Sequence, residues 1–268
     1  MSKENLTNKE LVMMKNSKQL SMDMNYPNSQ TSTKDWIKPQ PEEKIKSEKI
    51  NKFCIIIPDR GDRKEFTKHC LYQMSIQTVQ PNKIYHIDYE PVNPLPDLIP
   101  RIRSGINLAK KDGYDLCHII ENDDFYPINH FQIMQFEDYD FIGVIKTIYY
   151  SLILKKYRIM SHIDQIRSSL FCTGFRISAL EDFEFPDSMV KTLDMYLWNH
   201  ARMKGNFFLY DLKNMPIGIK HGIGLCGGAG HGITFGYDTD DIELEWLKKN
   251  TTYKSYEFYL KIIQMINN

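Results

Sequence analysis

The chain contains the run Cys117-His118-Ile119-Ile120-Glu121-Asn122-Asp123-Asp124-Phe125-Tyr126-Pro127, in which an apolar segment ends in acidic side chains and a turn proline. A short apolar run without polar alternation is typical of a parallel strand that is covered on both faces. Carboxylates at the carboxyl end of such a strand lie where α/β sheets bind ligands. Mg²⁺ or Mn²⁺ relieves the repulsion between them, because hard cations prefer oxygen ligands and bridge to phosphates. The run therefore predicts a metal and diphosphate site; the alternative is a strand followed by a solvated acidic turn.

Two further strand candidates precede this run and indicate the fold class. Phe53–Pro58 is wholly apolar, and Asn82–Asp88 contains a second apolar run. The spacing of apolar residues predicts helices over Lys64–Gln77 and from Leu98 to near Gly113. The order strand, helix, strand, helix, strand predicts an α/β domain with a mainly parallel sheet flanked by helices.

The second half of the chain is less regular. A strand is predicted over Asp140–Ile148, with a continuation toward Tyr150, and Tyr157–Ile159 is expected to pair with it. The remaining predicted elements are a short helix over Ser178–Phe183, a helix over Lys191–Lys204, a strand over Phe207–Leu209 and a terminal helix over Tyr253–Ile266.

Composition and charge restrict the class of protein. Of 268 residues, 42% are hydrophobic and 12% aromatic, which is enough for a sizeable core. The formal net charge of +0 gives no overall field for nucleic acid or anionic membranes. No apolar run approaches the roughly 20 residues of a membrane helix. Polar residues dominate 1–52, so we expect a flexible N-terminal arm followed by one folded domain over 53–268.

The cysteines and the N-terminus bear on the compartment. The five cysteines are scattered, with no CxxC pair. Cys54 and Cys117 fall in apolar strand candidates, where a buried free thiol is the expected role. The N-terminus lacks the apolar core of a secretory signal. These features predict a reduced, cytoplasmic protein.

Several residues near predicted strand ends are candidates for nucleotide binding. Asp88 ends the second strand, where a carboxylate can accept hydrogen bonds from a base or from ribose; the alternative is a turn or capping residue. Arg60, Arg63 and Arg103 offer guanidinium groups for phosphate oxygens, and solvated surface arginines are the alternative. Arg103 is favoured among them because it lies on the helix just before the acidic strand.

Two candidates for chemistry lie in the second half. Asp194 lies in Thr192–Trp198, a helical segment of otherwise mainly apolar groups, where a carboxylate with a raised pKa could act as a general base. The alternative is a carboxylate that complements the helix dipole. His221 could complete the carboxylate site, because imidazole binds Mn²⁺. The glycine-dense segment Gly218–Gly236, which includes His231, predicts a mobile flap or an ordinary surface loop.

These residues together resemble the pattern of nucleotide-sugar glycosyltransferases of the GT-A fold, particularly the family 2-like group. In that group the first strand ends in a proline and a polar turn, which resembles Pro58-Asp59-Arg60. The next helix closes in a Ser-Ile-x-x-Gln-Thr-like phrase, similar to Met74–Thr78. The second strand ends in a base-binding aspartate, as at Asp88. The Asp-x-Asp motif of the family is similar to Glu121-Asn122-Asp123-Asp124, with Glu121 in place of the first aspartate.

The resemblance implies a GT-A-like domain that moves a sugar from a nucleoside diphosphate sugar, UDP-sugar favoured, to an acceptor hydroxyl with inversion. It implies Mn²⁺ or Mg²⁺ held by Asp123, Asp124 and His221, and Asp194 as the catalytic base. Asp194 has Leu193 beside it rather than a second acid, so inversion and retention both stay open. The implied nucleotide-sugar contacts are Pro58, Asp59, Arg60, Asp88, Arg103, Glu121, Asn122 and Asp123.

Two other functions also fit the sequence. A nucleotidyltransferase of related fold needs a metal and carboxylates too, and it would release pyrophosphate from a nucleoside triphosphate. A non-catalytic nucleotide- or sugar-binding module would bind the donor without turnover. The acceptor is open among a glycan, a protein, a small molecule and a modified nucleobase.

Overall fold

The computed structural model describes residues 52–89, 97–187, 192–223 and 236–267. The chain divides into two units, and all of these residues belong to the second, Trp36–Asn268. The predicted N-terminal arm, His231 and most of Gly218–Gly236 lie outside the described residues, so the expectations for them stay predictions. In the described part of the chain, no helix has the length and apolar character needed to cross a membrane.

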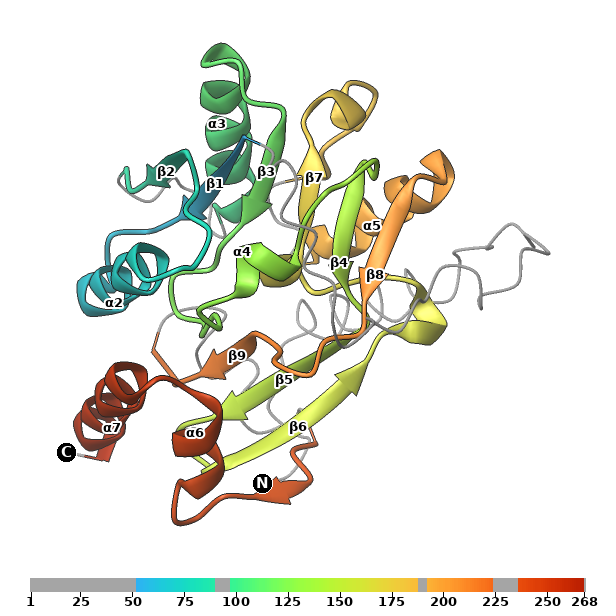
Figure 1. Cartoon of the computed structure of the whole chain (residues 1–268). Helices are drawn as coiled ribbons and strands as arrows, with labels where there is room; N and C mark the ends of the chain where they lie inside the picture. The colour runs from blue at the N-terminus through green and yellow to red at the C-terminus, as the bar shows by residue number, and fades with distance from the viewer. Residues whose placement is uncertain (1–51, 90–96, 188–191, 224–235, 268) are drawn as a thin grey trace, which may run out of the picture. The chain divides into compact units, whose positions relative to one another are not determined.

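A six-stranded central sheet is built from β1 (Phe53–Pro58), β2 (Lys83–Ile87), β3 (Leu116–Ile119), β4 (Phe141–Val144), β7 (Gly174–Arg176) and β8 (Phe207–Tyr210). Its order is β2-β1-β3-β7-β4-β8 (Figure 1). β1 runs parallel to β2 and β3, and β4 runs parallel to β8. Only β7 among these strands is antiparallel to its neighbours. The predicted α/β class with a mainly parallel sheet is therefore confirmed.

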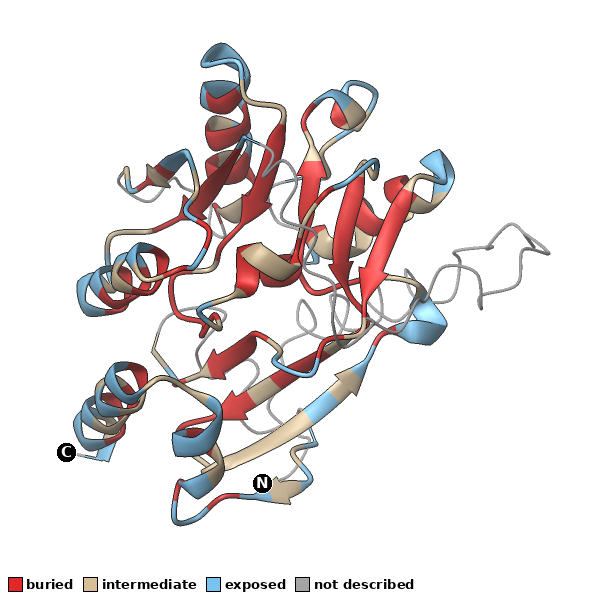
Figure 2. Cartoon of the chain, viewed as in Figure 1, coloured by how far each residue is buried: buried red, intermediate tan, exposed pale blue. Residues whose placement is uncertain are grey.

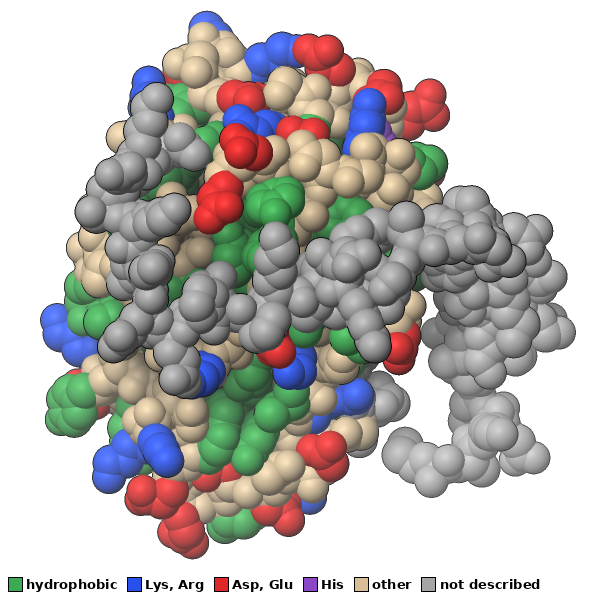
Figure 3. Space-filling model, turned by 45° about the vertical axis from the view of Figure 1, so that its right-hand side comes forward, with side chains coloured by type: hydrophobic (Ala, Val, Ile, Leu, Met, Phe, Trp, Pro, Cys, Tyr) green, Lys and Arg blue, Asp and Glu red, His purple; other side chains and the backbone are tan. Residues whose placement is uncertain are grey.

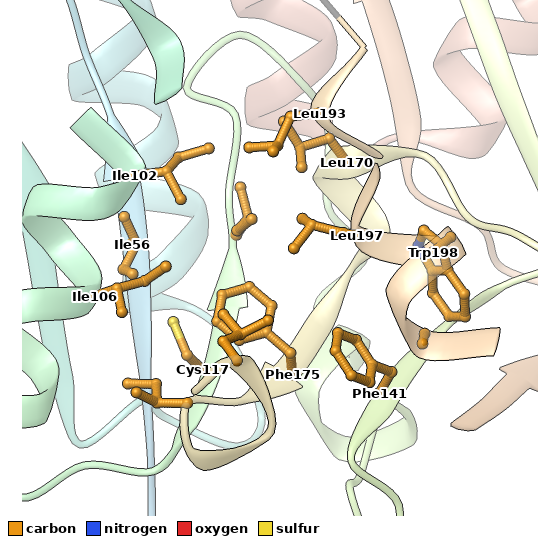
Figure 4. Close-up of a cluster of buried hydrophobic side chains, with 14 of the residues drawn as sticks. Ile56, Ile102, Ile106, Cys117, Phe141, Leu170, Phe175, Leu193, Leu197 and Trp198 are labelled. Atoms are coloured by element: carbon orange, nitrogen blue, oxygen red, sulfur yellow. The ribbon is translucent and has the colours of Figure 1, made fainter. Parts of the chain in front are cut away.

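Helices cover both faces of this sheet, namely α2 (Lys64–Ser75), α3 (Leu98–Lys111), α4 (His130–Ile133) and α5 (Leu193–Lys204). Alternate residues of β1 point to opposite faces, as the strand period requires. Cys54 and Ile56 pack in one cluster with α3 and α5, whereas Ile55 and Ile57 pack in another with α2 and α4. Figure 4 shows the first cluster, and Figure 2 shows that the central strands are buried. This double cover explains why the strands are apolar throughout.

Helix α3 approaches β1 closely because it carries a glycine at the contact. A Cβ on Gly105 would lie 2.5 Å from Ile56 Cγ2, which is shorter than any ordinary contact. The neighbouring α3 residues Ile102 and Ile106 are buried in the same cluster as Ile56. The glycine therefore sets the distance between this helix and the sheet.

A second sheet of order β10-β6-β5-β9 packs against two C-terminal helices. Ile148, Tyr150, Leu247 and Tyr259 belong to its buried cluster. The elements are β5 (Lys146–Ser151), β6 (Lys156–Ser161), β9 (Ile217–Lys220), β10 (Thr239–Asp240), α6 (Glu245–Asn250) and α7 (Tyr253–Asn267). Short 3₁₀ turns η3 (Ile163–Gln165), η4 (Leu170–Cys172) and η5 (Ser178–Leu180) complete the described elements.

The prediction of one strand from Asp140 to Ile148 is wrong. The chain leaves the central sheet after Val144 and enters the second sheet at Lys146. The residue between them, Ile145, donates its backbone N–H to Tyr210 O at 3.0 Å and is itself buried. The predicted pairing of the following strand with Tyr157–Ile159 is confirmed, because β5 and β6 are antiparallel neighbours.

The state of the cysteines and the distribution of surface charge agree with what the sequence predicts. Cys54, Cys70, Cys117 and Cys172 are free and buried, which confirms the expected role of Cys54 and Cys117. On the face drawn in Figure 3, acidic and basic side chains of the described residues lie in small mixed groups. The described side chains on that face form no extended patch of one sign.

Candidate active site

The acidic residues converge because β1 and β3 are adjacent and parallel, so that their carboxyl ends share one edge of the sheet. Asp59 follows β1, and Glu121-Asn122-Asp123-Asp124 follows β3 after Ile120. The backbone N–H of Ile120 donates to Ile56 O at 3.0 Å and fixes the register at this edge. One carboxylate oxygen from each of Glu121, Asp123 and Asp124 lies within 4.8 Å of the others.

Asp124 is the most enclosed member of this acidic cluster, with 0% of its surface exposed. Its Oδ1 accepts the backbone N–H of Ile219 at 2.8 Å. Its Oδ2 has no hydrogen-bond partner among the described residues. Gln73 supports the turn, because it donates to Asp124 O and accepts from the backbone N–H of Tyr126, each at 2.9 Å. The loop is thus rigidly held, while one carboxylate oxygen lacks a partner.

The acidic cluster suits a divalent cation. A cation about 2.0–2.6 Å from each carboxylate oxygen fits three oxygens that lie within 4.8 Å of one another. An unpartnered buried carboxylate oxygen is costly, and a cation is the partner that relieves it best. The residues that could hold such an ion are Glu121, Asp123 and Asp124.

Two cations of the chain already lie beside the acids. Arg63 donates through Nη1 to Asp123 Oδ2 and through Nη2 to Asn122 Oδ1, the latter at 2.9 Å. Burial would lower the pKa of Lys220, but the three neighbouring carboxylates raise it, so this lysine stays charged. The sequence indicates Arg63 only as one of three candidate phosphate contacts, and it does not single out Lys220. The position of Arg103 just before the acidic strand favours it over Arg63, and the apolar stretch before His221 points to that histidine rather than to Lys220.

The protonation of the three acids differs with their partners. Burial acts to raise the pKa of Asp123, but the charge of Arg63 and a hydrogen bond from His221 hold it well below its usual range. Burial raises the pKa of Glu121 to about 7 and that of Asp124 well above its usual range. Asp123 is therefore the permanent anion of the cluster.

His221 lies at the cluster with both ring nitrogens engaged. Its Nδ1 accepts the backbone N–H of Ile223 at 3.1 Å, which leaves the proton on Nε2. Nε2 lies 3.0 Å from Asp123 Oδ2, and the ring packs against Phe66 with centroids 4.2 Å apart. The structure thus brings His221 to Asp123 as a hydrogen-bond donor, and its role as a metal ligand stays a prediction.

The backbone explains how β9 reaches the cluster. Phe125 and Ile217 form an isolated bridge, with both of its N–H···O distances at 2.9 Å. This bridge joins the acidic loop to the second sheet and places Lys220 and His221, which follow it, beside the acids. The signal in the sequence was the apolar stretch before His221.

A second polar group lies at the ends of β1 and β2. Asp59 is 2% exposed and accepts from His86 Nε2 at 2.8 Å, Thr67 Oγ1 at 2.6 Å and the backbone N–H of Gly61 at 2.9 Å. Burial opposes these bonds, yet they lower the pKa of Asp59 to about 2. The side chain of Asp88 is 63% exposed and lies 3.7 Å from His86 Nδ1. Asp59 is therefore a fixed anion of the framework, and Asp88 is open to a ligand.

Buried Arg101, which the sequence did not single out, fixes the chain around Asp88. Its Nη1 donates to Ile87 O at 3.2 Å and to Tyr89 O at 2.7 Å. Its Nε and Nη2 donate to Asp97 at 2.9 and 2.6 Å. The guanidinium is buried among these acceptors, so its role is to hold the loop.

The other predicted nucleotide contacts are more scattered. Pro58 is the last residue of β1, in register with Ile87. Arg60 is hydrogen-bonded to Asp62 in the turn after β1. Arg103 lies on the exposed side of α3, with its guanidinium carbon 5.6 Å from the centre of the Phe185 ring. Among the described residues, none of these three forms a hydrogen bond or ion pair with the acidic cluster.

Asp194 lies in the first turn of α5 and is paired with Arg167. The Arg167 Nη1 to Asp194 Oδ2 distance is 2.6 Å, and the two side chains are 16% and 18% exposed, respectively. Burial raises the pKa of Asp194, with Arg167 opposing. The charge of Asp194 also raises the pKa of Glu121, so the two carboxylates act on one another. Arg167 is a further residue that the sequence did not indicate.

Comparisons with known proteins find matches among solved structures. No protein-family profile and no curated protein matches the chain. The structure of S. aureus TarS 1–349 in complex with UDP is 12% identical with TM-score 0.42, over 63% of this chain and 60% of that chain. The mannosyltransferase PcManGT from Pyrobaculum calidifontis, in complex with GDP-Man and Mn²⁺, is 11% identical with TM-score 0.42, over 77% of this chain and 63% of that chain. The chain thus spans less than two thirds of either.

Proposed function

We propose that this protein is a metal-dependent glycosyltransferase that takes its sugar from a nucleoside diphosphate donor, with UDP-sugars favoured. The observation that carries the proposal is the buried cluster of Glu121, Asp123 and Asp124 at the carboxyl edge of parallel strands. The unpartnered Asp124 Oδ2 supports a cation there. A hard cation bound by one or two carboxylates commonly takes phosphate oxygens as further ligands, and the carboxyl edge of an α/β sheet is where ligands bind.

The residues around the cluster could bind each part of the donor. Asp88 is exposed beside the end of β2 and can accept hydrogen bonds from the base or ribose. Asp123 and Asp124, with His221 beside them, would hold Mn²⁺ or Mg²⁺ against the diphosphate. When bound, the cation neutralises the charge that develops on the leaving nucleoside diphosphate.

Asp194 is the proposed base for transfer of the sugar to a hydroxyl. In the proposed reaction the acceptor oxygen forms a bond to the anomeric carbon, the bond from that carbon to the diphosphate breaks, and Asp194 takes the acceptor proton. Its raised pKa makes it a stronger base than an ordinary aspartate, and Arg167 holds its orientation. This step gives inversion. The acceptor itself stays open.

A panel of nucleotide sugars with Mn²⁺, scored for release of the nucleoside diphosphate, tests the proposal. We expect one donor to be hydrolysed slowly without acceptor, and chelation of the metal to stop the reaction. Release of pyrophosphate from a nucleoside triphosphate would instead identify a nucleotidyltransferase. Donor binding without turnover for every sugar and acceptor would identify a binding module.

A further inference from the structure

Arg63 and a divalent cation at the acidic cluster would share the carboxylate of Asp123. Asp123 Oδ2 accepts hydrogen bonds from Arg63 Nη1 and from His221 Nε2. The side chains of Arg63 and Asp123 are only 13% and 6% exposed, respectively. A metal ion bound by the carboxylate of Asp123 would face the guanidinium at short range, where two positive charges repel strongly because water screens them little.

The guanidinium of Arg63 is hydrogen-bonded along one edge. That edge is held by Asp123 and Asn122, while Nε has no hydrogen-bond partner among the described residues and lies 3.8 Å from Asp62 Oδ1. Arg63 immediately precedes α2, and no side chain caps that helix. Lys220 also lies beside the carboxylates, so the cluster keeps a second basic side chain if the guanidinium leaves.

We propose that Arg63 is an exchangeable counter-ion of this site. Without ligands it neutralises Asp123, and when a divalent cation takes that carboxylate the guanidinium transfers to an oxygen of the diphosphate. A planar guanidinium suits phosphate oxygens as well as carboxylate oxygens, so the transfer replaces one charge-assisted pair by another. The inference rests on the proposed function, and it adds a residue that weakens metal binding alone and strengthens binding of metal and nucleotide together.

Calorimetry on the full chain separates these two effects. We expect Arg63→Gln to bind Mn²⁺ alone more tightly than the wild type, because the competing cation is gone. With saturating Mn²⁺, the same variant should bind UDP more weakly. Each change should be roughly tenfold, the scale of a typical coupling between two ligands.

Two further variants make the comparison specific. Lys64→Gln removes one positive charge from the neighbouring exposed residue and should leave both affinities at wild-type values. Arg63→Lys keeps the charge and loses the planar fork, so it should leave the Mn²⁺ affinity near the wild-type value and weaken UDP. Melting temperatures of all variants control for folding.

The results against the inference are distinct from those against the proposed function. If the wild type binds Mn²⁺ and UDP and Arg63→Gln changes neither affinity, the exchange is refuted and the proposed function stands. A parallel fall of both affinities with a lower melting temperature would also refute it and assign Arg63 to the framework. If the wild type binds UDP equally well in a chelator, both proposals fail.

Discussion

At the scale of single residues, Asp123 and Asp124 are neighbours in the chain with opposite environments. Asp123 meets Arg63 and His221, whereas one oxygen of Asp124 meets only the backbone N–H of Ile219 and the other has no described partner. Their pKa values are displaced in opposite directions accordingly. The sequence indicated an acidic site, because several carboxylates follow a buried strand at the edge where α/β sheets bind ligands. It could not rank Arg63 above Arg103, because the contact with Asp123 joins residues 60 positions apart.

Asp194 gives the sharpest prediction about catalysis. Asp194→Asn keeps the shape of the side chain and removes its basicity, so we expect the rate of transfer to fall by ~10²–10⁴. Donor affinity should change by less than about tenfold, because the proton comes from the acceptor. Steady-state kinetics and donor titration measure the two effects. Transfer at near wild-type rate would refute the base role, and NMR of the product anomer would then test for retention.

Asp194 also predicts how the rate of transfer changes at acidic pH. Burial raises the pKa of Asp194, and a base must be ionised to accept a proton. Transfer should therefore be present above this raised pKa and be lost as the pH falls through it, at a higher pH than for an ordinary aspartate near about 3.9. Measurement of kcat against pH in the wild type checks the sign. A rate that increases toward low pH would contradict it.

The pair of His86 and Asp59 predicts a pH-dependent stability. Asp59 has a pKa lowered to about 2, so its contribution is complete above about pH 4 and is lost as pH falls further. The hydrogen bond to Asp59 raises the pKa of His86, with Asp88 adding to the effect, so its contribution is complete below about pH 6.5 and is lost as pH rises through the raised value. His86→Gln should cost about 1.5 kcal/mol near pH 5.5 and less near pH 9. Urea unfolding measures both, and an equal loss would show that the histidine contributes by packing alone.

At the scale of elements, the prediction of secondary structure was correct where it depends on a local apolar pattern. It was wrong where the end of a strand depends on strands that are distant in the sequence. Strand β1 and helix α3 can be recognised in the sequence from their apolar residues. Burial on both faces makes Phe53–Pro58 apolar throughout, and burial of one side of α3 spaces its apolar residues at the helical period. The run from Phe141 to Ser151 shows no break, yet it serves two sheets. The division depends on where β7, β8 and β9 lie, and no local pattern contains that information.

The contact between α3 and β1 predicts the cost of a larger side chain. Gly105→Val should destabilise the fold by about 1–3 kcal/mol, because its Cβ would overlap Ile56 and force the helix away from the sheet. Asn107→Ala, on the exposed side of the same helix, is the matched control and should change stability little. Chemical denaturation measures both. A Gly105 variant as stable as the wild type would mean that the helix shifts without loss of packing.

At the scale of the whole molecule, the site forms where two sheets meet. The central sheet supplies Asp59 and the acidic cluster, and the second sheet supplies Lys220 and His221 through the bridge between Phe125 and Ile217. The first part follows from strand order along the chain, so the sequence predicted it. The second part depends on a bridge between residues 92 positions apart (217 minus 125), and in the sequence only His221 pointed to it.

Calorimetric titration of the wild type with UDP, with Mn²⁺ and then with a chelator, tests the central claim that the acidic cluster binds a nucleoside diphosphate through a metal ion. Asp123→Asn is the test variant, and Asp138→Asn, an exposed acid away from the cluster, is its control. We predict binding with Mn²⁺ in the wild type and the control, and at least roughly tenfold weaker binding in chelator or in Asp123→Asn. Equal affinity for UDP in all four conditions would contradict the claim.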